Sequence, residues 1–160
     1  MCKTRALTGA LLGLVLAGCG AFQPRGTLDL PGSVQVQGGS FELRDALEAR
    51  LAGSGVRLAS KDADLVLAVR PEGFQERLLS VEPVRGEARE YQIAYEVRYT
   101  LKDDKGQKVL EPGDVKVVRA YRVHRGERLS RTREQAVIRD EMRREAAAAI
   151  VRRLHATSGG

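Results

Sequence analysis

The chain has 160 residues, of which 27 are basic and 21 acidic, so its formal net charge is +6 at neutral pH. This length is sufficient for one domain with a single hydrophobic core. The two cysteines, Cys2 and Cys19, both lie close to the N-terminus, which excludes a disulfide framework in the rest of the chain.

The first 18 residues have the pattern of a bacterial lipoprotein signal. Two basic residues are followed by a short apolar run over 6–15 and by the lipobox Leu16-Ala17-Gly18-Cys19. The apolar run is shorter than the roughly 20 residues that cross a bilayer. We therefore expect residues 1–18 to be removed and Cys19 to carry the lipid. An ordinary secretory signal that happens to end near a cysteine is the alternative.

Export and the anchor set the expected location and domain boundaries. Gly20 follows Cys19, where an aspartate commonly favours retention in the inner membrane, so the outer membrane, facing the periplasm, is favoured. Nucleic acid is not an expected partner in that compartment. Residues 19–32 are expected to form a tether, 33–156 a single domain and 157–160 a tail.

A strand and a helix are expected at the start of the domain. Ser33–Gln37 alternates between apolar and polar residues and predicts a strand. Ser40 is a suitable N-cap for the helix, and Gly53 and Gly55 can end it. The helix itself is predicted from apolar residues at helical spacing, namely Leu43, Ala46, Leu47 and Leu51.

Three further segments are predicted as strands. Asp64–Arg70 is rich in Val and Leu, and Phe74–Val81 continues it after the bend at Pro71. Tyr91–Leu101 alternates over eleven residues, which predicts one buried and one exposed face in an antiparallel sheet. Asp103–Gly106 then reads as a hairpin turn.

The chain returns from this turn as a last strand and then as a long helix. The strand is expected over Lys108–Leu110, with a break at Glu111–Gly113, and again over Val115–Arg125. The helix is expected from about Thr132 to Leu154, beginning with a capping box in Thr132–Gln135. Its apolar stripe is Ile138, Met142, Ala146, Ala149 and Ile150.

The order of these elements predicts an α/β sandwich. Two helices would pack on one face of a four-stranded antiparallel or mixed sheet, and the second face would stay open. Arg119 falls among apolar positions of the last strand, so the orientation of that strand is less regular. The open face would carry Gln92, Glu96, Arg98, Lys116, Arg122 and His124.

Basic residues are concentrated between Val115 and Arg133, where Glu127 is the sole acidic residue among them. The basic residues are Lys116, Arg119, Arg122, Arg125, Arg128, Arg131 and Arg133. Such a surface suits anionic lipid headgroups, a phosphorylated glycolipid or an acidic protein surface. A solvated strand and loop that are merely rich in arginine explain the pattern equally well.

The residues that usually carry catalysis do not form a recognisable pattern. His124 and His155 lack the spacing of metal ligands, and the sequence contains neither a nucleophile elbow nor a glycine-rich phosphate loop. The acidic pairs Asp103-Asp104 and Asp140-Glu141 fall on a turn and on a helix surface. We therefore expect a binding or assembly protein, with no enzymatic activity, cofactor or metal.

The chain resembles the LptE family of lipopolysaccharide-assembly lipoproteins. The resemblance rests on three stretches in the same order: the lipobox with Gly20 and the following Arg25-Gly26; Glu90-Tyr91-Gln92 with the Asp-Lys-Gly turn and Pro-Gly break beyond it; and the helix from Glu134 to Leu154. Together these stretches span nearly the whole exported chain.

The resemblance implies a fold with two helices on one side of a sheet, and a non-catalytic role. Family members plug the outer-membrane β-barrel LptD, help it to assemble and bind lipopolysaccharide on its way to the outer leaflet. The positions that correspond to lipopolysaccharide contacts in the family are Arg85 and Arg131, with Arg128 nearby. The planar guanidinium of arginine can donate two hydrogen bonds to phosphate oxygens.

Two classes of function therefore remain open. The leading hypothesis is an LptD plug anchored through its N-terminal lipid. The alternative is an auxiliary lipoprotein that faces the periplasm, serves another lipid-transport system and binds lipid alone.

Overall fold

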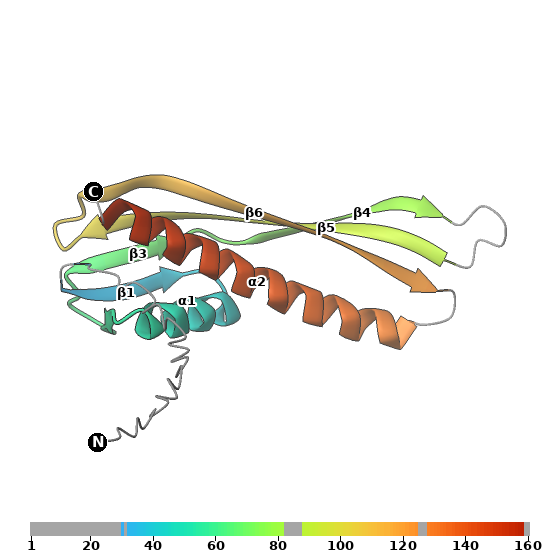
Figure 1. Cartoon of the computed structure of the whole chain (residues 1–160), viewed down its shortest axis with the longest axis horizontal. Coiled ribbons are helices and arrows are strands. Elements are labelled where there is room, and N and C mark those ends of the chain that lie inside the picture. The colour runs from blue at the N-terminus through green and yellow to red at the C-terminus, as the bar shows by residue number, and fades with distance from the viewer. Residues whose placement is uncertain (1–29, 31, 82–87, 125–127, 159–160) are drawn as a thin grey trace, which may run out of the picture.

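A computed structural model describes residues 30, 32–81, 88–124 and 128–158 of the chain. They form two layers, with a mixed sheet in one layer and two helices, both on one face of that sheet, in the other (Figure 1). The predicted α/β sandwich is confirmed, although the sheet has six strands and not four. In chain order the elements are β1 (Ser33–Gly38), α1 (Phe41–Gly53), β2 (Arg57–Leu58), β3 (Leu65–Val69), β4 (Gly73–Val81), β5 (Ala88–Asp103), β6 (Lys108–His124) and α2 (Arg128–Ser158).

The long strand β5 organises the sheet. Its C-terminal half pairs with β3, from Leu65↔Asp103 to Val69↔Tyr99, and its N-terminal half pairs with β4, from Gly73↔Glu96 to Val81↔Arg89. β6 runs antiparallel along the opposite edge of β5, while β1 lies parallel to both β2 and β3. The bend predicted at Pro71 therefore separates two strands that share one edge of β5.

Helix α1 begins and ends as the sequence predicts. Ser40 is its N-cap, and the Ser40 hydroxyl accepts a hydrogen bond of 3.2 Å from the backbone N–H of Leu43. Leu43, Leu47 and Leu51 are fully buried against the sheet. Gly55 follows with φ of 83°, a left-handed conformation that favours glycine.

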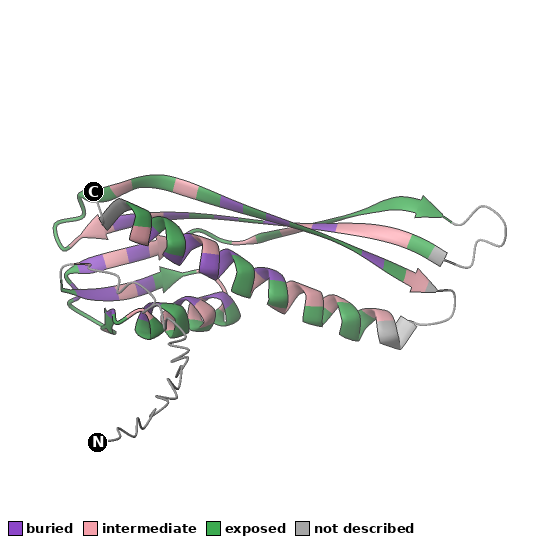
Figure 2. Ribbon diagram, viewed as in Figure 1, coloured by how far each residue is buried: buried purple, intermediate pink, exposed green. Residues whose placement is uncertain are grey.

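The apolar core lies where both helices cover the sheet, at the end of the molecule that contains β1 and β3 (Figure 2). Tyr99 and Leu101 of β5 are buried there together with Met142, Ile150 and Leu154 of α2. Ala146 and Ala147 are fully buried, and their small side chains allow α2 to lie close to its neighbours.

Beyond this core the molecule continues as a long, narrower extension, which we call the arm. It consists of β4, the paired residues 88–96 of β5 and 116–124 of β6, and residues 128–141 of α2 (Figure 1). Much of its surface is intermediate or exposed (Figure 2). The arm therefore depends more on polar contacts than the core does.

The predicted break in the last strand is wrong, because β6 is continuous from Lys108 to His124. Gly113 pairs with Tyr99 and Leu110 with Leu101, so two residues of β6 face a single residue of β5 at this point. This irregularity accommodates Pro112, which cannot donate a backbone hydrogen bond to a regular ladder.

The predicted start of the last helix is also wrong. α2 begins at Arg128, so Thr132 lies one turn inside the helix and is not its N-cap. Local capping signals are weak compared with tertiary contacts, and residues of this first stretch contact β4, as described below. α2 continues through Ser158. Among the described residues, no helix is long and apolar enough to span a membrane.

Candidate functional site

Two of the predicted site residues, Cys19 and Arg85, lie outside the described residues, and so does the side chain of Arg128. Val81 ends β4 and Ala88 begins β5, so they flank the segment that contains Arg85. Ala88 pairs with His124, which ends β6 just before α2 begins (Figure 1). Ala88 and His124, which flank the segments that contain Arg85 and Arg128, therefore lie side by side at the tip of the arm.

Arg131 is the predicted site residue whose contacts the structure describes, and it belongs to a polar cluster between α2 and β4. Its Nη2 lies 2.7 Å from Oε1 of Glu76. One turn along α2, Nε2 of Gln135 donates to Oε2 of Glu76 at 2.7 Å and to the Tyr121 hydroxyl at 2.6 Å. The Arg131 guanidinium also lies 4.5 Å above the ring of Tyr91, which stacks on Tyr121. We call these five residues the Glu76 cluster.

The electrostatics of the Glu76 cluster keep Arg131 charged. Burial lowers the pKa of Arg131, but interactions with Tyr121 and Glu76 outweigh this effect, so the pKa is raised overall. Burial also raises the pKa of Tyr121, so its hydroxyl stays neutral at physiological pH. The cluster is open to solvent, since the side chains of Arg131 and Glu76 are 34% and 22% exposed.

A second ion pair joins α2 to the chain just before β4. Arg143 donates from Nε to Oε1 of Glu72 at 2.8 Å, and the Tyr95 hydroxyl donates to Oε2 of Glu72 at 2.7 Å. These carboxylate and guanidinium side chains are only 10% and 17% exposed. Burial, followed by the hydrogen bond to Glu72, raises the pKa of Tyr95.

Phe74 lies between these two acidic residues along the strand. The guanidinium groups of Arg139 and Arg143 lie 5.1 and 4.9 Å from the centre of its ring, which is the arrangement of a cation–π contact. Glu72, just before β4, and Phe74 and Glu76 within it therefore alternate along the side that faces α2. The sequence interpretation did not single out these residues, although acidic residues at i and i+4 of a strand opposite an arginine-rich helix were a usable signal.

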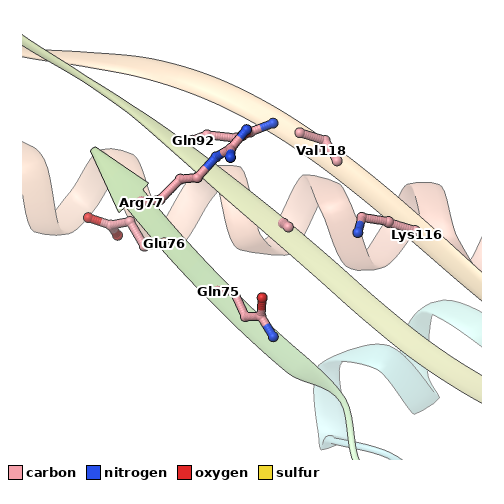
Figure 3. Close-up of a pocket in the computed structure, with 7 residues that line it drawn as sticks. Gln75, Glu76, Arg77, Gln92, Lys116 and Val118 are labelled. Atoms are coloured by element: carbon pink, nitrogen blue, oxygen red, sulfur yellow. The ribbon is translucent and has the colours of Figure 1, made fainter. Parts of the chain in front are cut away.

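The opposite, helix-free face of the sheet carries a shallow hollow in the arm (Figure 3). Residues from β4, β5 and β6 line it, namely Gln75, Glu76, Arg77, Gln92, Ala94, Lys116 and Val118. Nε of Arg77 donates to Oε1 of Gln92 at 2.5 Å, and Lys116 forms an ion pair of 2.7 Å with Glu96. Figure 3 shows Glu76 pointing away from Arg77 and Gln92, and its carboxylate accepts hydrogen bonds from Arg131 and Gln135 of α2.

Basic side chains outnumber acidic ones on the described part of this open face. A second hollow nearer the core is lined by Arg70, Arg98, Lys116, Glu96 and Asp114 among others. Gln92, Glu96, Arg98, Lys116 and Arg122 all lie on the open face, as the alternation predicts. The side chain of His124 lies outside the described residues.

Part of the basic run serves the fold itself. Arg119, which interrupts the apolar positions of β6, lies on the helix side and forms an ion pair with Glu145 of α2. Lys116 pairs with Glu96 across β5 and β6, and Arg131 pairs with Glu76. The basic residues between Val115 and Arg133 are therefore neither all available to a partner nor all merely solvated, since three of them form ion pairs within the fold.

No group of three histidine, cysteine or acidic side chains is placed to hold a metal ion in the part of the chain that the structure describes. The donors of the Glu76 cluster, the Arg131 guanidinium and the Gln135 amide, are groups that can bind oxyanions, and the open face offers amide and basic groups. The arrangement supports binding of an anionic or polar partner.

Comparisons with known proteins relate the chain to a protein family and to solved structures. The family model described as "LptE: Lipopolysaccharide-assembly" matches residues 32–154. No curated protein matches the chain. Several solved lipoprotein structures share its fold at low sequence identity, and three of them illustrate the range.

The minor lipoprotein from Acinetobacter baumannii is 20% identical, with a TM-score of 0.65 over 78% of this chain and 89% of that one. The rare lipoprotein B from Shewanella oneidensis is 24% identical, with a TM-score of 0.65 over 78% and 95%. The uncharacterized lipoprotein B from Nitrosomonas europaea is 17% identical, with a TM-score of 0.68 over 87% and 93%.

Proposed function

Because the chain belongs to the LptE family of lipopolysaccharide-assembly proteins, we propose that it is an outer-membrane lipoprotein that plugs the LptD β-barrel. In this role it assists assembly of the barrel and binds lipopolysaccharide during transport to the outer leaflet. The family is non-enzymatic, in agreement with the expectation that the chain catalyses no reaction.

The observation that carries the proposal is the arm, whose sheet is covered by α2 on one face and bare on the other. A solitary lipid carrier needs an enclosed apolar cavity, because the acyl chains must be kept from water. The hollows described on the bare face are open and are lined by Arg77, Gln92 and Lys116 among others. Such a surface is suited to packing against a polar wall.

The inside of an outer-membrane barrel is such a wall. Strands of these barrels alternate between apolar residues that face lipid and polar residues that face the lumen. The basic and amide side chains of the open face can form hydrogen bonds and ion pairs there, which an apolar surface could not. The elongated arm offers a long strip of this surface to a single partner.

The tip of the arm combines the two chemistries of a phosphorylated glycolipid. Leu78, Leu79 and Val81 of β4 are 44% to 49% exposed, which is unusual for large apolar side chains. In the chain, Arg85 falls between Val81, which ends β4, and Ala88, which begins β5, and Arg128 is the first residue of α2. Arginine suits phosphate groups and apolar side chains suit acyl chains, so both observations support lipopolysaccharide binding at this end.

The lipid on Cys19 would place the domain beside the barrel in the same membrane. Confinement to two dimensions raises the effective concentration of the domain near its partner without adding a contact. Multiple acyl chains on one residue also anchor a protein stably, where a single chain gives only marginal binding.

Purification of the lipidated protein from its native membrane in mild detergent tests the proposal. We expect a large β-barrel protein to co-purify in equal amount, as identified by mass spectrometry. Recovery of the protein alone with stoichiometric lipid would contradict the plug and would favour the auxiliary lipoprotein of another lipid-transport system.

A further inference from the structure

The carboxylate of Glu76 is held in the way that proteins hold a bound oxyanion. Arg131 donates to one carboxylate oxygen and Gln135 to the other, each at 2.7 Å. The two donors lie at i and i+4 on α2, so one face of the helix presents both toward β4. Tyr91 supports the guanidinium from below at 4.5 Å. A guanidinium and an amide that both donate to one carboxylate can also donate to another anion of similar size.

A comparison with the neighbouring ion pair shows that this one is accessible. Glu72, just before β4, and Arg143 of α2 form the other pair between these elements; they are 10% and 17% exposed, and Glu72 has a further donor in Tyr95. Glu76 and Arg131 are about twice as exposed and lie nearer the tip of the arm. The inner pair is therefore built into the fold, whereas the outer pair can exchange partners with groups in solution.

We propose that Glu76 occupies, in the unliganded protein, the position that a phosphate group of the ligand takes when it binds to Arg131 and Gln135. The inference rests on the proposed function, which supplies a phosphorylated glycolipid as the ligand. It assigns Glu76 as an internal competitor and Gln135 as a second donor to the phosphate.

Charge and geometry favour the exchange. A phosphomonoester carries more negative charge than a carboxylate and has three acceptor oxygens in place of two. Exposed ion pairs contribute little net free energy, so the Glu76 carboxylate is a weak competitor. Glu76 would thereby keep Arg131 oriented and shielded from monovalent anions until a phosphate of higher charge arrives.

The test is Glu76→Gln in the full-length lipidated protein, with lipopolysaccharide binding measured in mild detergent. Loss of the competing charge should tighten binding by about two- to fivefold, as expected for removal of one exposed ion pair. Glu96→Gln is the matched control. It changes the net charge by the same amount but frees Lys116 on the open face, and it should leave the affinity unchanged.

Two further variants keep the result interpretable. Glu76→Ala should tighten binding in the same direction, so a local effect of the glutamine amide can be separated from loss of the charge. In an Arg131→Gln background, Glu76→Gln should have a much smaller effect, because the guanidinium that the competitor masks is gone and only the Gln135 amide remains. Thermal unfolding of each variant checks that the fold is retained.

A comparison of three ligands identifies the chemical group that Arg131 and Gln135 recognise. Lipopolysaccharide and inorganic pyrophosphate should both show the effect of Glu76→Gln, and dephosphorylated lipopolysaccharide should not. Unchanged or weaker binding by Glu76→Gln would overturn the inference, as would equal tightening by Glu96→Gln. In either case lipopolysaccharide binding by the wild-type protein would leave the proposed function intact. If neither wild type nor Glu76→Gln binds any phosphorylated ligand, both are wrong.

Discussion

At the scale of single residues, Gly113 has a specific packing role, because its lack of a side chain leaves room for Tyr99. It pairs with Tyr99 directly beside the irregularity in β6, and a methyl group at its Cβ position would lie 2.6 Å from Cζ of the Tyr99 ring. Tyr99 is 1% exposed and cannot move aside freely. The glycine therefore allows a core tyrosine to lie directly against the backbone.

We expect Gly113→Ala to destabilise the protein by about 1–3 kcal/mol, as overpacking of a core does. Gly73→Ala is the control, because nothing lies within 4 Å of the corresponding methyl position at the start of β4. Chemical denaturation measures both. Equal losses at the two positions would show that backbone conformation, and not the Tyr99 contact, governs the effect.

Asp64 is a second residue with a specific structural role. Its Oδ2 accepts hydrogen bonds from the backbone N–H of Ser33 at 2.6 Å and from the Ser33 hydroxyl at 2.8 Å. These bonds hold the start of β1 beside the start of β3. They favour the charged carboxylate, so the pKa of Asp64 is lowered from its ordinary value of 3.8.

The sign of the resulting pH dependence follows from linkage. A carboxyl group whose pKa is lower in the folded than in the unfolded state stabilises the fold at pH values above its unfolded-state pKa. This contribution is lost as the pH falls from about 3.8 through the lower pKa of the folded state. Asp64→Asn should remove this part of the acid dependence. Unfolding free energies at neutral pH and across the acid range check it, and parallel curves for wild type and Asp64→Asn would contradict it.

At the scale of elements, α2 consists of two halves with different tasks. Its C-terminal half packs Met142, Ile150 and Leu154 into the apolar core. Its N-terminal half is part of the arm and contacts β4 through Arg131 and Gln135.

The ends of the two helices differ in charge. α1 has the acidic Glu42 in its first turn and the basic Arg50 in its last, both of which the helix dipole favours, whereas α2 has no acidic residue in its first turn. An anion at the start of α2 would therefore be stabilised by the helix.

The two halves should respond differently to truncation of apolar side chains. Ile150→Ala removes a fully buried side chain and should cost about 2–5 kcal/mol. Val137→Ala, on the same helix but 57% exposed, should change stability by less than about 0.5 kcal/mol. Denaturant titration compares them. A large loss at Val137 would mean that the arm is packed more tightly than its exposure indicates.

At the scale of the whole molecule, we expect the proposed anchor and the folded domain to have separable roles. The core of the domain is formed by described residues between Val34 and Leu154. We expect Cys19→Ala to leave the domain folded but to displace it from the outer membrane and to slow assembly of the barrel. Membrane fractionation and circular dichroism of the purified variant measure the two effects. Correct localisation of Cys19→Ala would show that the lipobox is not the anchor.

Much of the fold could be predicted because local patterns and tertiary packing agree. The alternation in β5 and the spacing of Leu43, Leu47 and Leu51 each identify the face that is buried in the structure. Predictions were wrong where tertiary pairing overrides a local signal. Pro112 lies inside β6 because the register shift against β5 absorbs it, and Thr132 lies inside α2 because the helix begins a turn earlier.

The candidate site was less predictable than the fold. The basic run of β6 and α2 is evident in the sequence, but its pairing with Glu76, Glu96 and Glu145 depends on which elements become neighbours. Glu76 and Arg131 are 55 residues apart in the chain. No local pattern relates them, since ion pairs between elements are formed by topology and register.

The sequence by itself predicted the lipoprotein signal with its lipobox, which stays a prediction, and it correctly predicted the two helices on one face of a sheet and the resemblance to a lipopolysaccharide-assembly family. The helices and strands follow from periodicity, which acts over a few neighbouring residues, whereas the resemblance rests on short motifs in a shared order. Only the tertiary structure decided that β4 extends the sheet into an arm, that one face of that arm is bare, and that Glu76 holds Arg131. The physical reason is that strand pairing and charge pairing join residues far apart in the chain, and their partners are fixed only when the chain has folded.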